Sequence, residues 1–191
     1  SHAGVVQCCG VNWRGADRGE GLKCALTPPE NPHIAASVGN SRRVKRLDTY
    51  GTVRYPGPHY ERNVGNGQDT TETITKYYYA QMGKMRRLVA FRRGTTLYYV
   101  MPDHLGGTLR VVNTSGGSID DIRYHAFGAT RSGGTNLQTD KRFTGQTLDQ
   151  STGLYDYGAR AYDAVLGRFT KPDSIVPSLA NPQSLNRYSY G

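Results

Sequence analysis

"ETITKYYYAQMGKMRRLVAFRRGTTLYYVM", residues 72–101, contains three short runs of strand-forming residues separated by two turn signals. The first run is rich in Thr and Tyr, which favour strands. Gln81-Met82-Gly83 and Arg93-Gly94-Thr95 are typical of tight turns, and Pro102 ends the last run because proline lacks a backbone N–H. The expected strands are 72–79, 85–91 and 96–101. Three strands joined in this way form an antiparallel meander.

The same scheme occurs on both sides of this stretch. "RRVKRLDTYGTVRYPG", residues 42–57, predicts two strands around a turn at Tyr50-Gly51. "TLRVVNTSGGSIDDIRYHAFG", residues 108–128, predicts two more strands around Ser115-Gly116-Gly117, with a further turn at Gly128. Since no long stretch has apolar residues at helical spacing, the sequence predicts an all-β protein of serial antiparallel hairpins that form a curved sheet.

An internal repeat supports the hairpin scheme. Tyr77-x-Tyr79-x-x-x-Gly83-x-x-Arg86 matches Ile122-x-Tyr124-x-x-x-Gly128-x-x-Arg131 at an offset of 45 residues. The first and third residues of each copy lie on one face of a strand, and the glycine permits the positive φ of a turn. A repeated unit of this kind buries its apolar face by stacking on its neighbours.

The charge composition indicates which classes of partner the chain could bind. The net charge is +9, from 24 Lys+Arg against 15 Asp+Glu. Basic residues interleave with Tyr in residues 76–93, a pattern that suits either a solvated strand face or binding to a polyanion such as nucleic acid, in which bases stack on Tyr and phosphates pair with Arg. No known nucleic-acid-binding motif accompanies it.

Residues 1–40 have a different texture. They are rich in Pro, Asn and Ser without a period, which predicts a linker or irregular segment. They hold all three cysteines, Cys8, Cys9 and Cys24, which are expected to be free thiols because no second ligand pair completes a zinc site. We expect no metal and no cofactor. The first residues lack a charged region followed by an apolar core, so we expect that they are not a signal peptide. No apolar run is long enough to span a membrane.

Several motifs together resemble the Rhs/YD-repeat family. "YYYAQMGKM", residues 77–85, resembles a degenerate YD repeat in which Ala80 stands where Asp is usual. "YVMPDHLGGTLRVVNTSGG", residues 99–117, and "RFTGQTLDQSTGLYDYGARAYDAVLGRFTKPDS", residues 142–174, resemble the Rhs-repeat-associated core. The resemblance covers about residues 41–191. It implies degenerate YD-repeat strands over 41–100 and the associated core over 101–191.

The resemblance implies a function as well as a fold. In the family, YD repeats form a spiral β-sheet shell. In bacterial polymorphic toxins this shell encloses a C-terminal cargo. The associated core, which is similar to the C component of Tc toxins, releases the cargo by aspartyl-type self-cleavage. Teneurins use a similar shell for adhesion. The implied partners are a polypeptide cargo, the rest of the parent shell and other copies at exposed edge strands. The implied location is secreted or at the cell surface.

The same resemblance suggests where catalysis would occur. Asp163 and Asp173 match the core's aspartates and would form the acid pair, and Arg160 would orient them. The alternative is structural: both aspartates cap turns, and Arg160 and Arg168 stack on Tyr rings. The family's Asp-Pro is replaced by Asp163-Ala164 and Asp173-Ser174, and the chain ends at Gly191, inside the run that continues to Asp-Pro-x-Gly. This chain alone is therefore expected to be inactive.

A neighbouring acid and histidine form a second candidate. Asp103-His104-Leu105-Gly106 has no Ser, Cys or second His near it in sequence to complete a triad or a metal site. It follows Pro102 and precedes two glycines. We therefore expect a structured turn between strands, with its polar groups satisfied locally.

Overall fold

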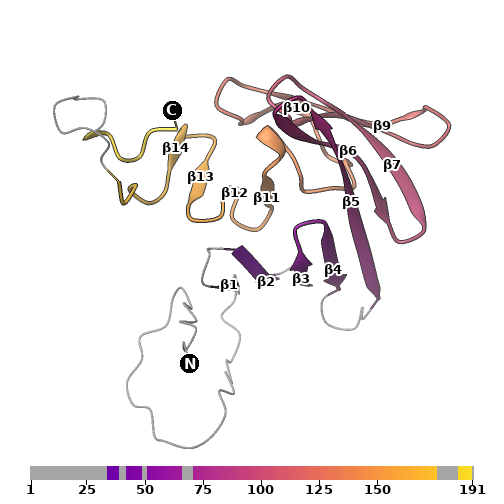
Figure 1. The fold of residues 1–191 in the computed structure, drawn as a ribbon, viewed down its shortest axis with the longest axis horizontal. Coiled ribbons are helices and arrows are strands. Elements are labelled where there is room, and N and C mark those ends of the chain that lie inside the picture. The colour runs from indigo at the N-terminus through magenta and orange to yellow at the C-terminus, as the bar shows by residue number, and fades with distance from the viewer. Residues whose placement is uncertain (1–33, 39–41, 49–50, 66–70, 176–184, 191) are drawn as a thin grey trace, which may run out of the picture.

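Ten strands form one antiparallel sheet whose spatial order is the chain order (Figure 1). The computed structural model describes residues 34–38, 42–48, 51–65, 71–175 and 185–190. The strands are β1 (Ile34–Val38), β2 (Arg42–Asp48), β3 (Gly51–Gly57), β4 (Tyr60–Val64), β5 (Glu72–Met82), β6 (Met85–Arg93), β7 (Thr96–Pro102), β8 (Thr108–Val112), β9 (Ser118–Tyr124) and β10 (Thr130–Gly133). Each pairs with the next, so the predicted all-β meander is confirmed.

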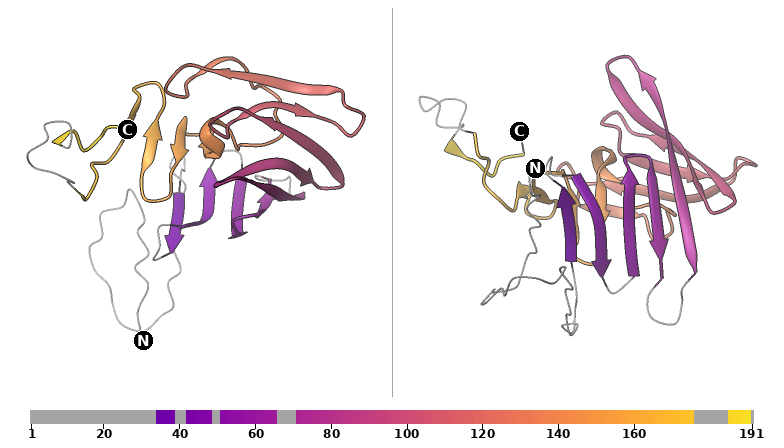
Figure 2. Two further views of the ribbon diagram at one scale, coloured as in Figure 1. Left: turned by 45° about the horizontal axis from the view of Figure 1, so that its top comes forward. Right: turned by 60° about the horizontal axis from the view of Figure 1, so that its bottom comes forward.

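A second, four-stranded sheet follows in the chain. A 3₁₀ turn, η1 (Phe143–Gly145), leads into it. Its strands are β11 (Thr147–Asp149), β12 (Leu154–Asp156), β13 (Ala161–Asp163) and β14 (Arg168–Phe169), again in chain order. The large sheet is curved, and the small sheet lies on its hollow side in both views of Figure 2.

Two boundaries differ from those expected. β5 continues to Met82, because Gln81 and Met82 pair with Arg86 and Met85 of β6, so the turn falls at Gly83-Lys84. β1 lies inside the segment expected to be irregular, because pairing with β2 outweighs the surrounding Pro and Asn residues.

Cys8, Cys9 and Cys24 lie outside the described residues. The expected division at residue 100 falls within β7, and the sheet continues through it.

The inner face of the large sheet carries the main core. Phe91, Val111 and Ile122 are fully buried, and Phe91 stacks on Tyr98 with ring centroids 5.0 Å apart. The other buried members of this cluster are Tyr77, Leu88, Val100 and Leu137. Leu137 comes from the segment after β10, so the chain folds back to cover the face that it has just built.

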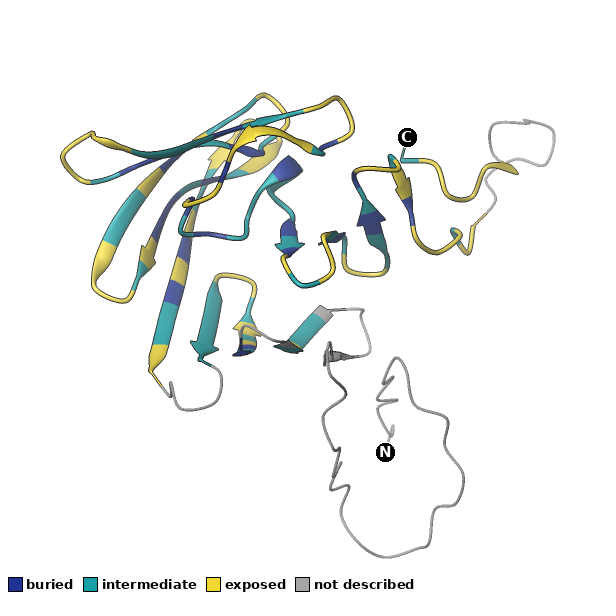
Figure 3. Ribbon diagram, turned by 180° about the vertical axis from the view of Figure 1, so that it is seen from behind, coloured by how far each residue is buried: buried dark blue, intermediate teal, exposed yellow. Residues whose placement is uncertain are grey.

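A second core joins the small sheet to the end of the large one. Phe143, Tyr155, Tyr162, Ala164 and Phe169 are buried together. The Tyr162 hydroxyl donates to the carbonyl of Phe127 at 2.8 Å, and the Phe143 and Tyr124 rings are 5.6 Å apart. Figure 3 shows buried residues where η1 and the small sheet meet the large sheet, and exposed residues at the hairpin tips. The two sheets therefore pack as one body.

The internal repeat has the predicted geometry. Tyr77 and Ile122 are both buried in the main core, while Tyr79 and Tyr124 pack beside it. Gly83 and Gly128 have φ of 61° and 91°. At Gly128 a Cβ would lie 2.4 Å from the Phe143 ring, so this position requires glycine for space as well as for conformation.

Candidate functional site

Arg160 and Asp173, two of the three residues predicted to be catalytic, form an ion pair. Arg160 Nη2 is 3.0 Å from Asp173 Oδ2, and the guanidinium lies 3.8 Å over the Phe169 ring. The backbone of Asp173 is fixed by two hydrogen bonds with Arg187: its N–H donates to the Arg187 carbonyl, and Arg187 Nε donates to its carbonyl. The end of the described chain therefore holds Asp173 beside β13 and β14.

Asp163, the third predicted residue, ends β13 and caps the turn that follows. Its Oδ1 accepts the N–H groups of Val165 at 2.9 Å and Leu166 at 3.0 Å. Among the described residues, no hydrogen bond or ion pair joins Asp163 to Asp173 or to Arg160. The structure thus brings Arg160 to Asp173 and gives Asp163 a turn-capping contact.

The Asp103-His104 segment is a turn, as expected. Asp103 Oδ1 accepts the N–H groups of Leu105 at 2.9 Å and Gly107 at 2.8 Å. Asn113 repeats this turn ten residues later, because its Oδ1 accepts the N–H groups of Ser115 and Gly117. The carboxylate of Asp103 is therefore satisfied locally. No group of three or more His, Cys, Asp or Glu side chains suited to a metal ion occurs in the described part of the chain.

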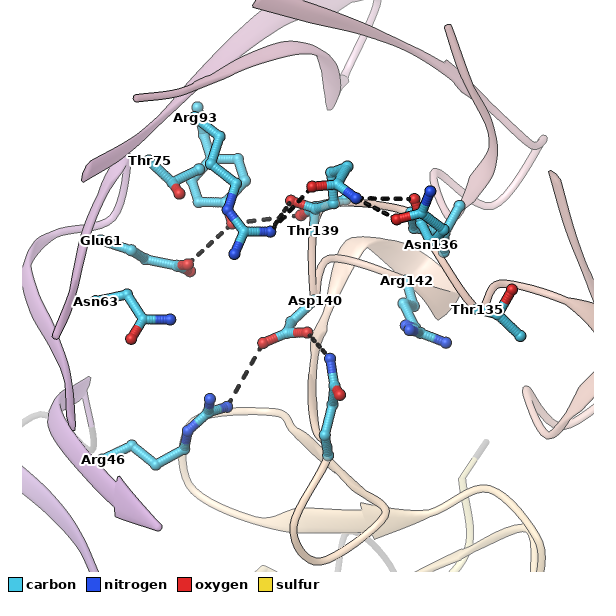
Figure 4. Close-up of a pocket in the computed structure, with 14 residues that line it drawn as sticks. Arg46, Glu61, Asn63, Thr75, Arg93, Thr135, Asn136, Thr139, Asp140 and Arg142 are labelled. Carbon is cyan, nitrogen blue, oxygen red and sulfur yellow. Dashed lines mark hydrogen bonds and ion pairs between the residues drawn. The ribbon is translucent and has the colours of Figure 1, made fainter. Parts of the chain in front are cut away.

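A polar cavity of about 370 Å³ lies between the inner face of the large sheet and the segment 135–142 (Figure 4). Its wall includes Glu61 of β4, whose Oε2 accepts a hydrogen bond from the Tyr77 hydroxyl at 2.9 Å. Burial raises the pKa of the Glu61 carboxyl above its usual range, against a smaller opposing effect from Lys141. The Tyr77 hydroxyl is also 3.3 Å from Thr139 Oγ1, which links the sheet to the segment that crosses it.

Arginines of β2 attach the first strands to the small sheet. Arg43 Nε is 2.9 Å from Asp156 Oδ2, and Arg43 Nη1 is 3.3 Å from Asp149 Oδ2. Arg46 Nη1 is 3.6 Å from Asp140 Oδ2. These pairs join residues about a hundred positions apart in the chain. Sequence reasoning missed Glu61 and Asp140, since charged residues in alternating strands and loops carry no local signal of burial.

The family of the chain follows from comparison with known proteins. The family model described as Teneurin YD-shell matches residues 42–191. The chain belongs to the teneurin YD-shell family. This YD-shell chain is 36% identical to Salivary gland surface protein 1 of Aedes aegypti over 122 residues and 31% identical to Teneurin-1 of Gallus gallus over 125 residues. These matches cover 61% and 63% of the chain, which spans 4% of each relative.

Solved structures give the same fold. The YD-shell chain superposes on the crystal structure of TcdB2-TccC3 with a TM-score of 0.69 and 18% identity, over 88% of this chain and 9% of that one. The TcdB2-TccC3-Cdc42 structure gives a TM-score of 0.67. The resemblance to Rhs/YD-repeat proteins is confirmed, and the YD-shell chain is a structural piece of such a shell. In the described part of the chain, no helix is long and apolar enough to cross a membrane.

Proposed function

We propose that this chain forms part of the wall of a YD-shell that encloses a polypeptide cargo, in a protein that is secreted or displayed at the cell surface. The observation that carries the proposal is the open sheet, in which β1 and β10 each pair with one neighbour among the described strands. A strand with one unpaired edge is a template for a further strand. In the parent protein, other repeats would extend this sheet.

The proposal predicts that the isolated chain associates through its edges. Its sedimentation should show dimers or larger species that dissociate on dilution. Replacing Thr130 in the exposed β10 with Pro should weaken the association. Thr130 lies opposite Tyr124, next to the hydrogen-bonded pair His125 and Ala129, so its N–H faces the free edge.

The same replacement at Thr114 is the control, because Thr114 is the second residue of the exposed turn from Asn113 to Gly116, a position that suits proline. A single sedimenting species with the mass of the monomer at all concentrations would contradict the proposal.

We also propose that the Asp163, Asp173 and Arg160 set supports self-cleavage in the parent protein. An aspartyl mechanism needs one ionised carboxylate to activate water and one protonated carboxyl to donate to the carbonyl oxygen. Water adds to the carbonyl carbon of the scissile peptide, the C–N bond breaks, and the leaving amine takes a proton. The contact of Arg160 Nη2 with Asp173 Oδ2 at 3.0 Å supports Arg160 as the residue that orients this carboxyl, and Asp163 would supply the second carboxyl.

A longer polypeptide tests this second proposal. In it, Gly191 is followed by a tail that contains Asp-Pro-x-Gly, and cleavage is read as two bands on a denaturing gel. Asp173→Asn and Asp163→Asn should each leave one band. Asp121→Asn, which also alters a carboxylate paired with an arginine, Arg110, is the matched control and should still cleave. Cleavage that survives Asp173→Asn would remove the assignment.

A second candidate function is polyanion binding by the outer face of β5–β7. Lys76 lies opposite Arg92, and Tyr78 and Tyr99 both lie opposite Ala90, so all four exposed side chains share one face. Tyr rings with flanking cations suit stacked bases and phosphates. Binding to a random oligonucleotide that weakens steeply with salt, and that is lost in Tyr78→Ala/Tyr99→Ala, would support it. No binding at low salt would exclude it.

A further inference from the structure

Three turns of the large sheet share one hydrogen-bond geometry. They follow β7, β8 and β9, and they begin at Asp103, Asn113 and His125. In each turn the N–H of the first residue donates to the carbonyl of the fifth, and the N–H of the fourth, a glycine, donates to the carbonyl of the first. Because the same backbone turn forms with three different first residues, it does not require the carboxamide of Asn113.

The side chain of Asn113 contributes only its oxygen to the turn. Oδ1 accepts the N–H groups of Ser115 at 3.0 Å and Gly117 at 2.8 Å. Asp103 Oδ1 makes the same two contacts at the equivalent positions of its own turn, without an amide nitrogen. Among the described residues, no hydrogen bond uses Asn113 Nδ2. This nitrogen is therefore available for a role other than holding the turn.

The sequence around this nitrogen is an acceptor sequence for N-linked glycosylation. Asn113-Thr114-Ser115 has the form Asn-x-Ser/Thr with a residue other than Pro in the middle, and no other stretch of the sequence has this form. The two equivalent turns carry Leu105 and Phe127 where Ser115 supplies a hydroxyl. The acceptor sequence thus occurs in one of the three turns.

The Asn113 turn also has the open surroundings that a glycan needs. Because successive hairpin turns alternate between the two ends of a sheet, this turn lies at the end opposite the other two. A Cβ on Gly107 or on Gly128 would crowd the segment 142–144, whereas a Cβ on Gly116 of the Asn113 turn meets nothing within 4 Å. The four residues that follow Asn113 are exposed, in agreement with the exposed hairpin tips of Figure 3.

We propose that Asn113 is the attachment site of an N-linked glycan. The donor is an oligosaccharide joined to a polyprenyl diphosphate, and the transferase recognises the hydroxyl of Ser115. A bond forms between Asn113 Nδ2 and C1 of the first sugar, the bond from C1 to the diphosphate oxygen breaks, the diphosphate leaves with the electron pair, and Nδ2 releases one proton. The step rests on the proposed secreted or cell-surface location, since such glycans mark surface loops of secreted proteins. In the parent protein this hairpin tip would then face solvent.

Translation of the whole chain with endoplasmic reticulum membranes tests the inference. A cleavable signal peptide added before Ser1 directs import, so the result does not depend on the location of the parent protein. We expect the imported chain to migrate more slowly on a denaturing gel and to regain the mobility of the bare polypeptide after treatment with peptide N-glycosidase. Asn113→Asp, which keeps the Oδ1 acceptor, and Thr114→Pro should each abolish the shift, and Ser115→Thr should retain it.

Two outcomes would overturn the proposal. One is an imported, protease-protected chain that shows no shift, and the other is a shift that survives Asn113→Asp. The absence of the glycan would remove only this inference, because association through β10 is measured on the chain without a glycan.

A glycan moved to a packed turn supplies the matched control. Asp103→Asn/Leu105→Ser places the same acceptor sequence in the turn that lies against the segment 142–144, and Asn113→Asp in the same chain removes the original site. The glycan at Asn113 should leave the midpoint of urea unfolding unchanged relative to the deglycosylated chain, whereas the glycan at the packed turn should lower it. An equal decrease at both turns would contradict the open surroundings of Asn113 and overturn the proposal.

Discussion

The Tyr77 hydroxyl donates to Glu61 Oε2 at 2.9 Å, between neighbouring strands β4 and β5 on the inner face of the sheet. Glu61 lies opposite Thr75, which is buried, so the carboxyl points inward from a strand that is otherwise polar. Burial also raises the pKa of Tyr77. Burial therefore disfavours ionisation of both Tyr77 and Glu61. Because the Glu61 carboxyl loses its proton as the pH rises, the contribution of this pair to stability depends on pH.

The stability of the chain should fall as the pH rises above the ordinary range of a Glu carboxyl. Folding raises the pKa of Glu61, so between the unfolded pKa of about 4.3 and the higher folded pKa the native state binds more protons than the unfolded chain. The free energy of unfolding therefore decreases across that window. Glu61→Gln, which keeps an acceptor for Tyr77, should remove this decrease. Urea unfolding from pH 4 to pH 7 measures it.

An exposed carboxylate supplies the control for that experiment. Glu72→Gln alters a residue that pairs with the exposed Arg62 at the start of β5. Unlike Glu61→Gln, it should retain the decrease in the free energy of unfolding that the unaltered chain shows between pH 4 and pH 7. A pH profile of Glu61→Gln that parallels that of the unaltered chain would refute the assignment to Glu61.

Arg43 should stabilise the junction between the two sheets. It contacts Asp149, which is 1% exposed, and Asp156. Arg43→Ala takes the cation away from two carboxylates, one of which is buried, and should lower the free energy of unfolding by roughly 3 kcal/mol. Denaturant unfolding measures this loss. Lys45→Ala, an exposed position on the same strand, should cost less than about 0.5 kcal/mol.

The hydroxyl of Tyr162 makes a separate contribution at this junction. The ring is fully buried and the hydroxyl donates to the Phe127 carbonyl at 2.8 Å. Tyr162→Phe leaves that carbonyl without this donor and should cost about 1–2 kcal/mol in a denaturant titration. Tyr188→Phe, at a position that is 43% exposed, should cost little. Equal losses in the two variants would contradict the role of this hydrogen bond.

The strands could be predicted because their signals are local. Alternating Tyr and Thr, followed by Gly or by Pro102, fixes where a strand and its turn fall, and a meander needs only neighbouring strands to pair. The aromatic cluster around Tyr162 was not predicted, because β12, β13 and β14 have only two or three residues each and therefore show no period.

The candidate sites depend on contacts that no local pattern encodes. Arg43 meets Asp149 across 106 residues, and Arg93 meets Gln138 across 45. The segment 135–142 crosses the inner face because Leu137 enters the main core. A single leucine in a polar loop gives no sequence signal that predicts this burial. The family resemblance pointed to Arg160 and Asp173, which form an ion pair, whereas no sequence pattern indicated the cavity.

The internal repeat provides a matched pair of glycines for a final prediction. Gly83 and Gly128 occupy the same repeat position with positive φ, but a Cβ on Gly83 meets nothing within 4 Å whereas one on Gly128 meets the Phe143 ring at 2.4 Å. Gly83→Ala should cost only the conformational penalty of about 1 kcal/mol. Gly128→Ala adds a steric clash in the second core and should cost at least about 3 kcal/mol in total.

Urea unfolding of the two glycine variants separates backbone strain from packing. The further double substitution Gly128→Ala/Phe143→Leu removes part of the ring and should recover some of the stability lost in Gly128→Ala, whereas Phe143→Leu alone should destabilise the chain. Equal costs for Gly83→Ala and Gly128→Ala would mean that Phe143 does not pack against the turn. That result would also remove the contact through which η1 anchors the small sheet to the end of the large one.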